Sequence, residues 1–165
     1  MVQLWVNLPA IHKSTLAHYQ AIEAGQMGKV ELGSGAGSVN VIAGKFRDVV
    51  GPASTYSPVN LFDIRLNTGG ELSFENPAIH NTALLVVNGD ININDQLAPQ
   101  HSFVLFRNDG EEISIRAVNE AVLLFLSGEP INEPIASYGP FVMNTQAEIQ
   151  QAIMEFQSGK FGVLE

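Results

Sequence analysis

The sequence contains no cysteine and has few basic residues for its length. Without cysteine the chain can form no disulfide, no thiolate metal site and no cysteine nucleophile, which is typical of a cytoplasmic protein. Its 8 Lys and Arg residues stand against 17 Asp and Glu residues, giving a formal net charge of −9. Because the few basic residues form no cluster, the composition argues against direct nucleic-acid binding and against an anionic membrane surface.

Long apolar runs are also missing. No stretch approaches the ~18 consecutive apolar residues that a membrane-spanning helix needs, and the first residues lack the basic and apolar segments of a signal peptide. We therefore expect a cytoplasmic location and no membrane partner. A length of 165 residues fits one domain, so we predict a single domain over residues 1–165.

The region of residues 59–126 has the alternation of apolar and polar residues that predicts β-strands. Alternation occurs in residues 60–66, 71–75 and 91–93, and residues 83–87 are apolar on both faces, as in a central strand. Asn88-Gly89 predicts a two-residue hairpin turn. Further strands are predicted over residues 103–106, 113–117 and 121–126. Short strands at this spacing predict an all-β sandwich or barrel core.

The segments before this core have patterns of their own. Residues 1–9 alternate and predict a linking strand, and we interpret residues 10–58 as lead-in strands and loops. The glycine-rich residues 33–37 lack the spacing and the following helix of a phosphate-binding loop, so they predict a hairpin turn instead.

After the core, residues 127–165 form an extended, proline-rich tail that ends in a helix. Thr145 and Glu148 have the spacing of a capping box at the start of this helix. Gly159 stands where a C-terminal glycine is expected. The helix carries an apolar stripe that needs a partner surface, formed by Ile149, Ala152, Ile153 and Phe156.

The tail and the opening residues resemble a known family. The opening residues 3–9 resemble the pirin segment that leaves the first cupin domain, and residues 57–66 resemble the start of the second cupin. The tail resembles the end of pirin-family proteins in Gly128-Glu129-Pro130, Glu133-Pro134, residues 138–145 and Gly159-Lys160-Phe161-Gly162. This resemblance implies the C-terminal cupin domain only, an all-β double-stranded β-helix or jelly-roll barrel with a short C-terminal α-helix.

Pirins are bicupins, and the resemblance implies that their iron site lies in the other, N-terminal barrel. That barrel holds iron through three histidines and a glutamate. Some members act as quercetin 2,3-dioxygenases, and eukaryotic members serve as nuclear cofactors of transcription factors. Since this chain resembles only the second barrel, the family's metal ligands have no positions here.

The cupin metal motifs can also be laid on this barrel itself, using Gly70, Gly89 and Pro99 as landmarks. The ligand positions then fall on side chains that are poor ligands or none: Asn76, Ala78, Thr82 and Val104. Iron(II) sites of this type need imidazole and carboxylate donors. The resemblance therefore implies a barrel without a metal and without a cofactor.

Two histidines leave an alternative open. His80 and His101 lie close to the motif strands and would form a facial triad with Glu75 or Asp95 if all of them met at the barrel mouth. Both lie near turn or proline signals, so we interpret them as ordinary hydrogen-bonding histidines.

Three functional hypotheses follow. The first is a metal-free binding or assembly module that forms a homodimer, with an interface drawn from Leu4, Trp5, Val6, Ile149, Ile153 and Phe156. The second is a small quercetinase-like dioxygenase or isomerase with a non-standard metal site at His80 and His101. The third is a subunit that meets a separately encoded metal-binding cupin. No catalytic residue is identified by the sequence.

Overall fold

The computed structural model describes residues 2–161, and the chain divides into two compact units. The larger unit spans residues 18–130, and the smaller unit combines the residues before 18 with those after 130. The predicted barrel core lies wholly in the larger unit, and the predicted tail lies almost wholly in the smaller one. Whether the two units form one domain stays a prediction.

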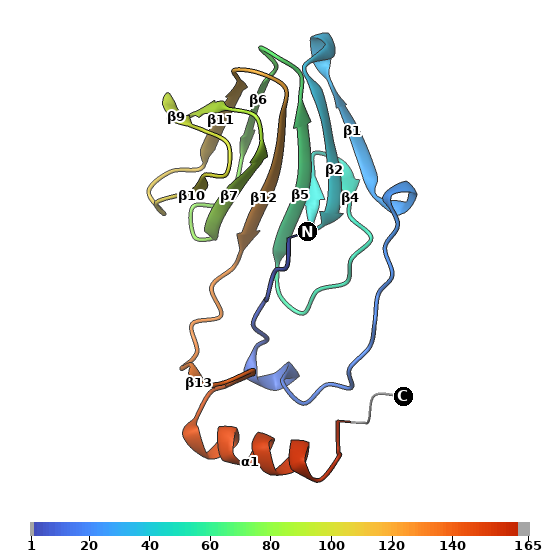
Figure 1. Ribbon diagram of the computed structural model, residues 1–165, viewed down its shortest axis with the longest axis vertical. Coiled ribbons are helices and arrows are strands. Elements are labelled where there is room, and N and C mark those ends of the chain that lie inside the picture. The colour runs from blue at the N-terminus through green and yellow to red at the C-terminus, as the bar shows by residue number, and fades with distance from the viewer. Residues whose placement is uncertain (1, 162–165) are drawn as a thin grey trace. The chain divides into compact units, whose positions relative to one another are not determined.

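Within residues 18–130 the strands form two main antiparallel sheets and a short hairpin (Figure 1). The six-stranded sheet has the order β1 (Gly28–Leu32), β2 (Gly37–Ala43), β5 (Val59–Leu66), β12 (Ala121–Gly128), β7 (Asn81–Asn88) and β10 (Phe103–Leu105). The four-stranded sheet has the order β6 (Glu71–Glu75), β11 (Glu112–Ala117), β8 (Ile91–Ile93) and β9 (Gln96–Ala98). The hairpin pairs β3 (Lys45–Phe46) with β4 (Val49–Val50). Short 3₁₀ helices occupy Ala24–Gln26 and Gly33–Gly35.

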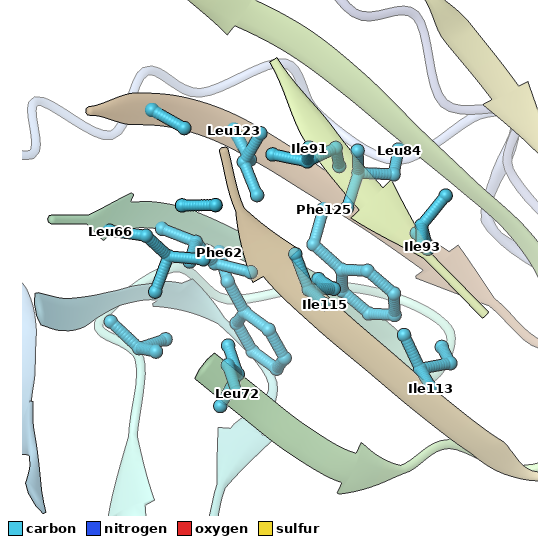
Figure 2. Packing of buried hydrophobic residues seen from close by; sticks show 14 of the residues in the cluster. Phe62, Leu66, Leu72, Leu84, Ile91, Ile93, Ile113, Ile115, Leu123 and Phe125 are labelled. Atoms are coloured by element: carbon cyan, nitrogen blue, oxygen red, sulfur yellow. The ribbon is translucent and has the colours of Figure 1, made fainter. Parts of the chain in front are cut away.

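The two sheets share one hydrophobic core. Alternate residues of each strand point inward, so that Ile113 and Ile115 of β11 meet Phe62 of β5 and Phe125 of β12 (Figure 2). Phe62 and Phe125 are stacked with 5.4 Å between ring centroids, and Phe74 meets Phe125 edge to face at 5.1 Å. Full burial of one such side chain stabilises the fold by about 1.5–3 kcal/mol. The predicted all-β barrel core is confirmed.

The predicted strands of the core are confirmed with small shifts of their ends, and so is the turn at residues 33–37. β1 and β2 pair antiparallel on either side of it, with Leu32 opposite Gly37. Residues 83–87 lie in β7, which is flanked by β12 and β10. Strand β7 is therefore an interior strand, as its apolar sequence predicts.

The hairpin predicted at Asn88-Gly89 is wrong. β7 belongs to the six-stranded sheet, whereas β8 pairs with β11 and β9 in the other sheet. The turn carries the chain from one sheet to the other, and the backbone N–H of Asp90 donates to Asn119 Oδ1 at 2.7 Å. Gly89 has φ +77°, and a Cβ there would meet the carbonyl oxygen of Glu120. The Asn-Gly pair therefore marks a tight turn that connects the two sheets, and not a turn between two paired strands.

The strand predicted over residues 1–9 is also wrong for residues 2–9, which form no regular secondary structure. Leu4 and Val6 are about half exposed, at 45% and 53%. Alternation alone does not make a strand, because its backbone N–H and C=O groups need a neighbouring strand. Met1 lies outside the described residues.

The smaller unit contains a hairpin and a helix. The hairpin pairs β13 (Ala136–Tyr138) with β14 (Phe141–Met143), and α1 (Gln146–Gln157) contacts both strands. A 3₁₀ helix spans Ala10–His12. Thr145 and Glu148 form the predicted capping box, and Gly159 follows the helix with φ +78°. The helix prediction is confirmed, and residues 162–165 of the predicted tail lie outside the described residues.

Across residues 2–161, no helix is both long and apolar enough to cross a membrane. The cytoplasmic location stays a prediction.

Candidate functional site at one end of the barrel

A turn between β6 and β7 brings polar side chains to one end of the larger unit. The backbone N–H of Asn76 donates to the carbonyl oxygen of Glu111 at 2.8 Å, and that of His80 donates to Pro77 at 3.0 Å. Strand pairing places Ser127 of β12 directly opposite Thr82 of β7. Four polar residues from the turn and from two neighbouring strands therefore meet where the sheet ends.

These four side chains are buried and joined by hydrogen bonds. Asn76, His80, Thr82 and Ser127 are each at least nine-tenths buried. Ser127 Oγ donates to Asn76 Oδ1 at 2.7 Å, and His80 Nδ1 lies 2.9 Å from Ser127 Oγ. Asn76 Nδ2 donates to Thr82 Oγ1 at 2.9 Å. Buried polar groups are costly unless they are paired, so this network fixes the four side chains in place.

A cavity of about 510 Å³ opens beside this network. Its volume is in the range of small-molecule sites, which is roughly 300–1,000 Å³. The cupin ligand positions identified in the sequence all line it, namely Asn76, Ala78, Thr82 and Val104. The structure thus brings these positions together around one space, as the motif placement requires.

Charged residues also line this cavity. The lining contains three acidic residues, Asp109, Glu111 and Glu112, and one basic residue, Arg107. All four are exposed. Negative side chains therefore outnumber positive ones, in a chain whose formal net charge is −9. The electrostatic field of such a cavity favours cations over anions.

A second cavity of about 310 Å³ shares Asn76 with the first. Phe46, Phe62 and Phe74 line it, together with Lys45 and other polar residues. The aromatic residues belong to the core of the barrel. Asn76 and Asn60 connect this cavity to the same polar network, because Asn60 Nδ2 donates to Ser127 Oγ at 3.4 Å.

The structure places His80 in the site and His101 outside it. His101 lies in a turn with φ +68°, is exposed, and has Nε2 3.2 Å from Gln100 Nε2. It does not line the 510 Å³ cavity, and neither does Asp95, whereas Glu75 lines the second cavity. Within residues 2–161, no group of three or more His, Asp and Glu residues could hold a metal ion. The structure does not assemble the triad considered from the sequence.

The residues of the predicted interface differ in their exposure to solvent. Trp5 is 68% exposed and Phe156 is 62% exposed, in addition to the half-exposed Leu4 and Val6. Ile153 is half-buried, and Ile149 is 3% exposed in a helix that contacts both strands of its hairpin. Ile149 therefore belongs to the packing of α1 on its own hairpin and is not available to a partner. The interface itself stays a prediction.

A polar cluster caps α1 in the smaller unit. Glu148 Oε2 accepts hydrogen bonds from the hydroxyl and the backbone N–H of Thr145 at 2.9 and 2.7 Å, and from the backbone N–H of Asn144 at 3.0 Å. The hydrogen bond from the Thr145 hydroxyl is the main cause that lowers the pKa of Glu148, and the backbone donors and Lys13 act in the same direction. The cluster anchors the helix start and holds no arrangement typical of catalysis.

Comparison with known proteins identifies the family of this barrel. The family described as the Pirin C-terminal cupin domain matches residues 61–162. The chain belongs to the pirin C-terminal cupin family. This pirin-type cupin is 30% identical to human Pirin over 166 residues, covering 98% of the chain and 57% of Pirin.

Other relatives carry an enzyme name. A Pseudomonas aeruginosa protein named "Putative quercetin 2,3-dioxygenase" is 40% identical over 161 residues, covering 98% of the chain and 56% of that protein. The crystal structure of quercetin 2,3-dioxygenase from Acinetobacter baumannii superposes with a TM-score of 0.91 at 40% identity, covering 98% of the chain and 56% of that structure. The pirin-type cupin thus spans little more than half the length of these relatives.

The donor set of this pirin-type cupin does not fit an iron site. An amide, a methyl, a hydroxyl and an isopropyl group occupy the four ligand positions, at Asn76, Ala78, Thr82 and Val104. Non-haem iron needs imidazole and carboxylate donors. His80 is the one imidazole in the cavity lining of the described chain, and its Nδ1 is engaged by Ser127.

Sequence reasoning missed Ser127. Its signal is weak, since a serine at the end of the apolar strand β12 resembles any strand terminus. Only the pairing of β12 with β7 shows that Ser127 joins Asn76 and His80. A polar residue in the inward-facing register of β12, after Leu123 and Phe125, was the one available clue.

Proposed function

We propose that this chain is a binding and assembly module of the pirin type, whose barrel acts without a metal of its own. One observation carries the proposal. The four cupin ligand positions surround a single cavity, and the side chains at those positions are Asn76, Ala78, Thr82 and Val104. The framework of a cupin site is therefore present, while the groups that hold a metal in such sites are replaced.

Metal content tests this proposal. The chain is purified without a metal-affinity step, incubated with Fe(II) under anaerobic conditions, desalted, and analysed for iron per chain. We expect a content far below one iron per chain. One iron per chain, lost in His80→Ala but retained in the matched variant His101→Ala, would contradict the proposal and identify His80 as a ligand.

The runner-up is a small dioxygenase or isomerase, and two observations favour it. Relatives of this chain carry the name quercetin 2,3-dioxygenase, and His80 lines the cavity. Oxygen uptake by the iron-treated chain in the presence of quercetin tests it. We expect no uptake above the rate of free iron, whereas iron-dependent turnover that disappears in His80→Ala would establish the runner-up.

Assembly through a second copy of the chain is supported by the exposed apolar residues of the smaller unit. Trp5, at 68% exposure, is the largest of them. Clusters of exposed apolar residues favour association in water. Sedimentation over a range of concentrations tests this, and we expect a homodimer that Trp5→Ser weakens. Tyr138→Ser is the matched control, because Tyr138 is equally exposed at 67% and lies outside the proposed interface.

A concentration-independent monomer mass would contradict the homodimer. Co-purification of the chain with a separately encoded metal-binding cupin would favour the third hypothesis, in which this barrel is one subunit of a larger assembly. The Trp5→Ser variant distinguishes the two cases, because it affects self-association only if Trp5 lies in a homodimer interface.

A further inference from the structure

In each hydrogen bond of the network around His80, the donor and the acceptor can be assigned. Thr82 Oγ1 donates to the carbonyl oxygen of His80 at 3.3 Å, and Asn76 Nδ2 reaches the carbonyl oxygen of Pro77 at 3.4 Å. Carbonyl oxygens only accept hydrogen bonds. The Thr82 hydroxyl proton is therefore used, so Thr82 Oγ1 must accept from Asn76 Nδ2, which orients the amide and turns Asn76 Oδ1 toward Ser127.

This assignment determines which nitrogen of His80 carries a proton. Ser127 Oγ uses its single proton to donate to Asn76 Oδ1. Ser127 Oγ must then accept from His80, which places a proton on Nδ1. In the neutral imidazole, Nε2 is consequently a bare acceptor.

The bare nitrogen is available to the cavity. His80 is 8% exposed and lines the 510 Å³ cavity, whereas Ser127 is not part of the lining. The ring edge that carries Nδ1 therefore faces the network, and the opposite edge faces the cavity. Nε2 has no hydrogen-bond partner among residues 2–161. Nε2 is not among the described side-chain atoms that are both buried and without a partner, so it is open to solvent at the cavity, where a ligand with a donor group would take the place of water.

The charges around the cavity specify the kind of donor. Asp109, Glu111 and Glu112 outnumber Arg107 in the lining, so a cationic donor is favoured over a neutral one and an anion is disfavoured. The apolar part of the lining, which includes Ile93 and other aliphatic residues, suits a hydrocarbon body.

We propose that this cavity binds a small organic amine in its ammonium form, with the ammonium group donating to His80 Nε2. The acidic side chains at the cavity attract the cation, and the apolar lining contacts its hydrocarbon part. The proposal rests on the proposed function, because a metal bound at Nε2 would occupy the same acceptor.

A charge series on one aromatic body tests the ligand class. The full chain, labelled with nitrogen-15, is titrated with benzylamine, benzyl alcohol and benzoate, and the amide signals of the cavity residues are followed. We expect saturable chemical-shift changes with benzylamine, which should bind with the highest affinity, and weaker binding of benzyl alcohol. Benzoate should cause no saturable change. Equal affinity for the three compounds, preference for benzoate, or no saturable shift with benzylamine would overturn the proposal.

Two variants test the roles of the residues. His80→Asn retains an amide donor at the position of Nδ1 for Ser127 and removes the Nε2 acceptor. We expect it to fold and to bind benzylamine about tenfold more weakly or worse, since it loses a hydrogen bond to a charged group. The double change Glu111→Gln and Glu112→Gln should weaken benzylamine but not benzyl alcohol, whereas Glu129→Gln, at an exposed carboxylate that does not line the cavity, should change neither.

The tautomer of His80 is measured on the unaltered chain. Long-range nitrogen–proton correlation spectra of the imidazole should show a proton on Nδ1 and none on Nε2 when the ring is neutral. A proton on Nε2 would overturn the inference even if every variant failed to fold.

These outcomes are separable from failure of the proposed function. If the chain holds one metal ion per chain, the proposed function fails, and the imidazole signals report a metal ligand. If the chain is metal-free but does not prefer benzylamine, only the ligand class is wrong.

Discussion

Replacing Ser127 by alanine tests the network that positions His80. The Ser127 hydroxyl accepts from His80 Nδ1 at 2.9 Å and donates to Asn76 Oδ1 at 2.7 Å. Alanine removes these two hydrogen bonds and a third, which Ser127 Oγ accepts from Asn60 Nδ2 at 3.4 Å. It leaves two buried groups, His80 Nδ1 and Asn76 Oδ1, without partners. Each such group costs about 1–3 kcal/mol. Because the neighbouring cavity admits water to part of the network, we expect the lower half of the summed range, about 2–4 kcal/mol of lost stability.

The assay is urea unfolding followed by circular dichroism in the sheet region, since most strands belong to the larger unit. Ser73→Ala is the matched control. Ser73 donates to Ser114 across β6 and β11 at 3.2 Å in an exposed position, where a substitution usually changes stability by less than about 0.5 kcal/mol. Equal effects of the two alanine variants would refute the buried network, and with it the assignment of the His80 proton.

Three further results are expected. Phe125→Ala should cost about 3–5 kcal/mol in urea unfolding, because Phe125 is fully buried between two aromatic rings; a loss below about 1 kcal/mol would contradict the packing. Gly37→Ala should unfold more easily than Gly33→Ala, because Gly37 has φ +140° and its added Cβ would meet the carbonyl oxygen of Arg65, whereas Gly33 has open space; equal midpoints would contradict this. The helix content of α1 should fall in acid, because the pKa of Glu148 is lowered in the folded state. The stabilising contribution of Glu148 is present above the ordinary pKa of 4.5 and is lost as the pH falls through the lowered pKa of the folded state. A Glu148→Gln variant with the same acid transition would contradict this prediction.

Much of the fold could be predicted from the sequence because its signals are local. The alternation in β5 and the apolar run in β7 predict their burial directly, since successive side chains point to opposite faces. The capping box of Thr145 and Glu148 likewise depends only on residues three positions apart. Such features require no knowledge of what packs against them.

The errors concern features that depend on distant partners. Asn88-Gly89 permits a tight turn, but only the pairing of β8 with β11 shows that this turn changes sheets. Residues 2–9 alternate like a strand, yet no neighbouring strand pairs with them. The residues of the candidate site likewise differ in whether the local sequence predicts them. The motif spacing predicted the positions of Asn76 and Thr82, whereas Ser127 enters the site only through the pairing of β12 with β7.

Iron binding by a variant with restored ligands, compared with the unaltered chain, tests the central claim most directly. The variant carries Asn76→His, Ala78→His, Thr82→Glu and Val104→His, and both proteins are titrated anaerobically with Fe(II) in a calorimeter. Because these four positions surround one cavity, the account predicts about one high-affinity iron for the variant and none for the unaltered chain. Stoichiometric iron in the unaltered chain would contradict the claim that this barrel works without a metal, and a folded variant that binds no iron would contradict the placement of the motif.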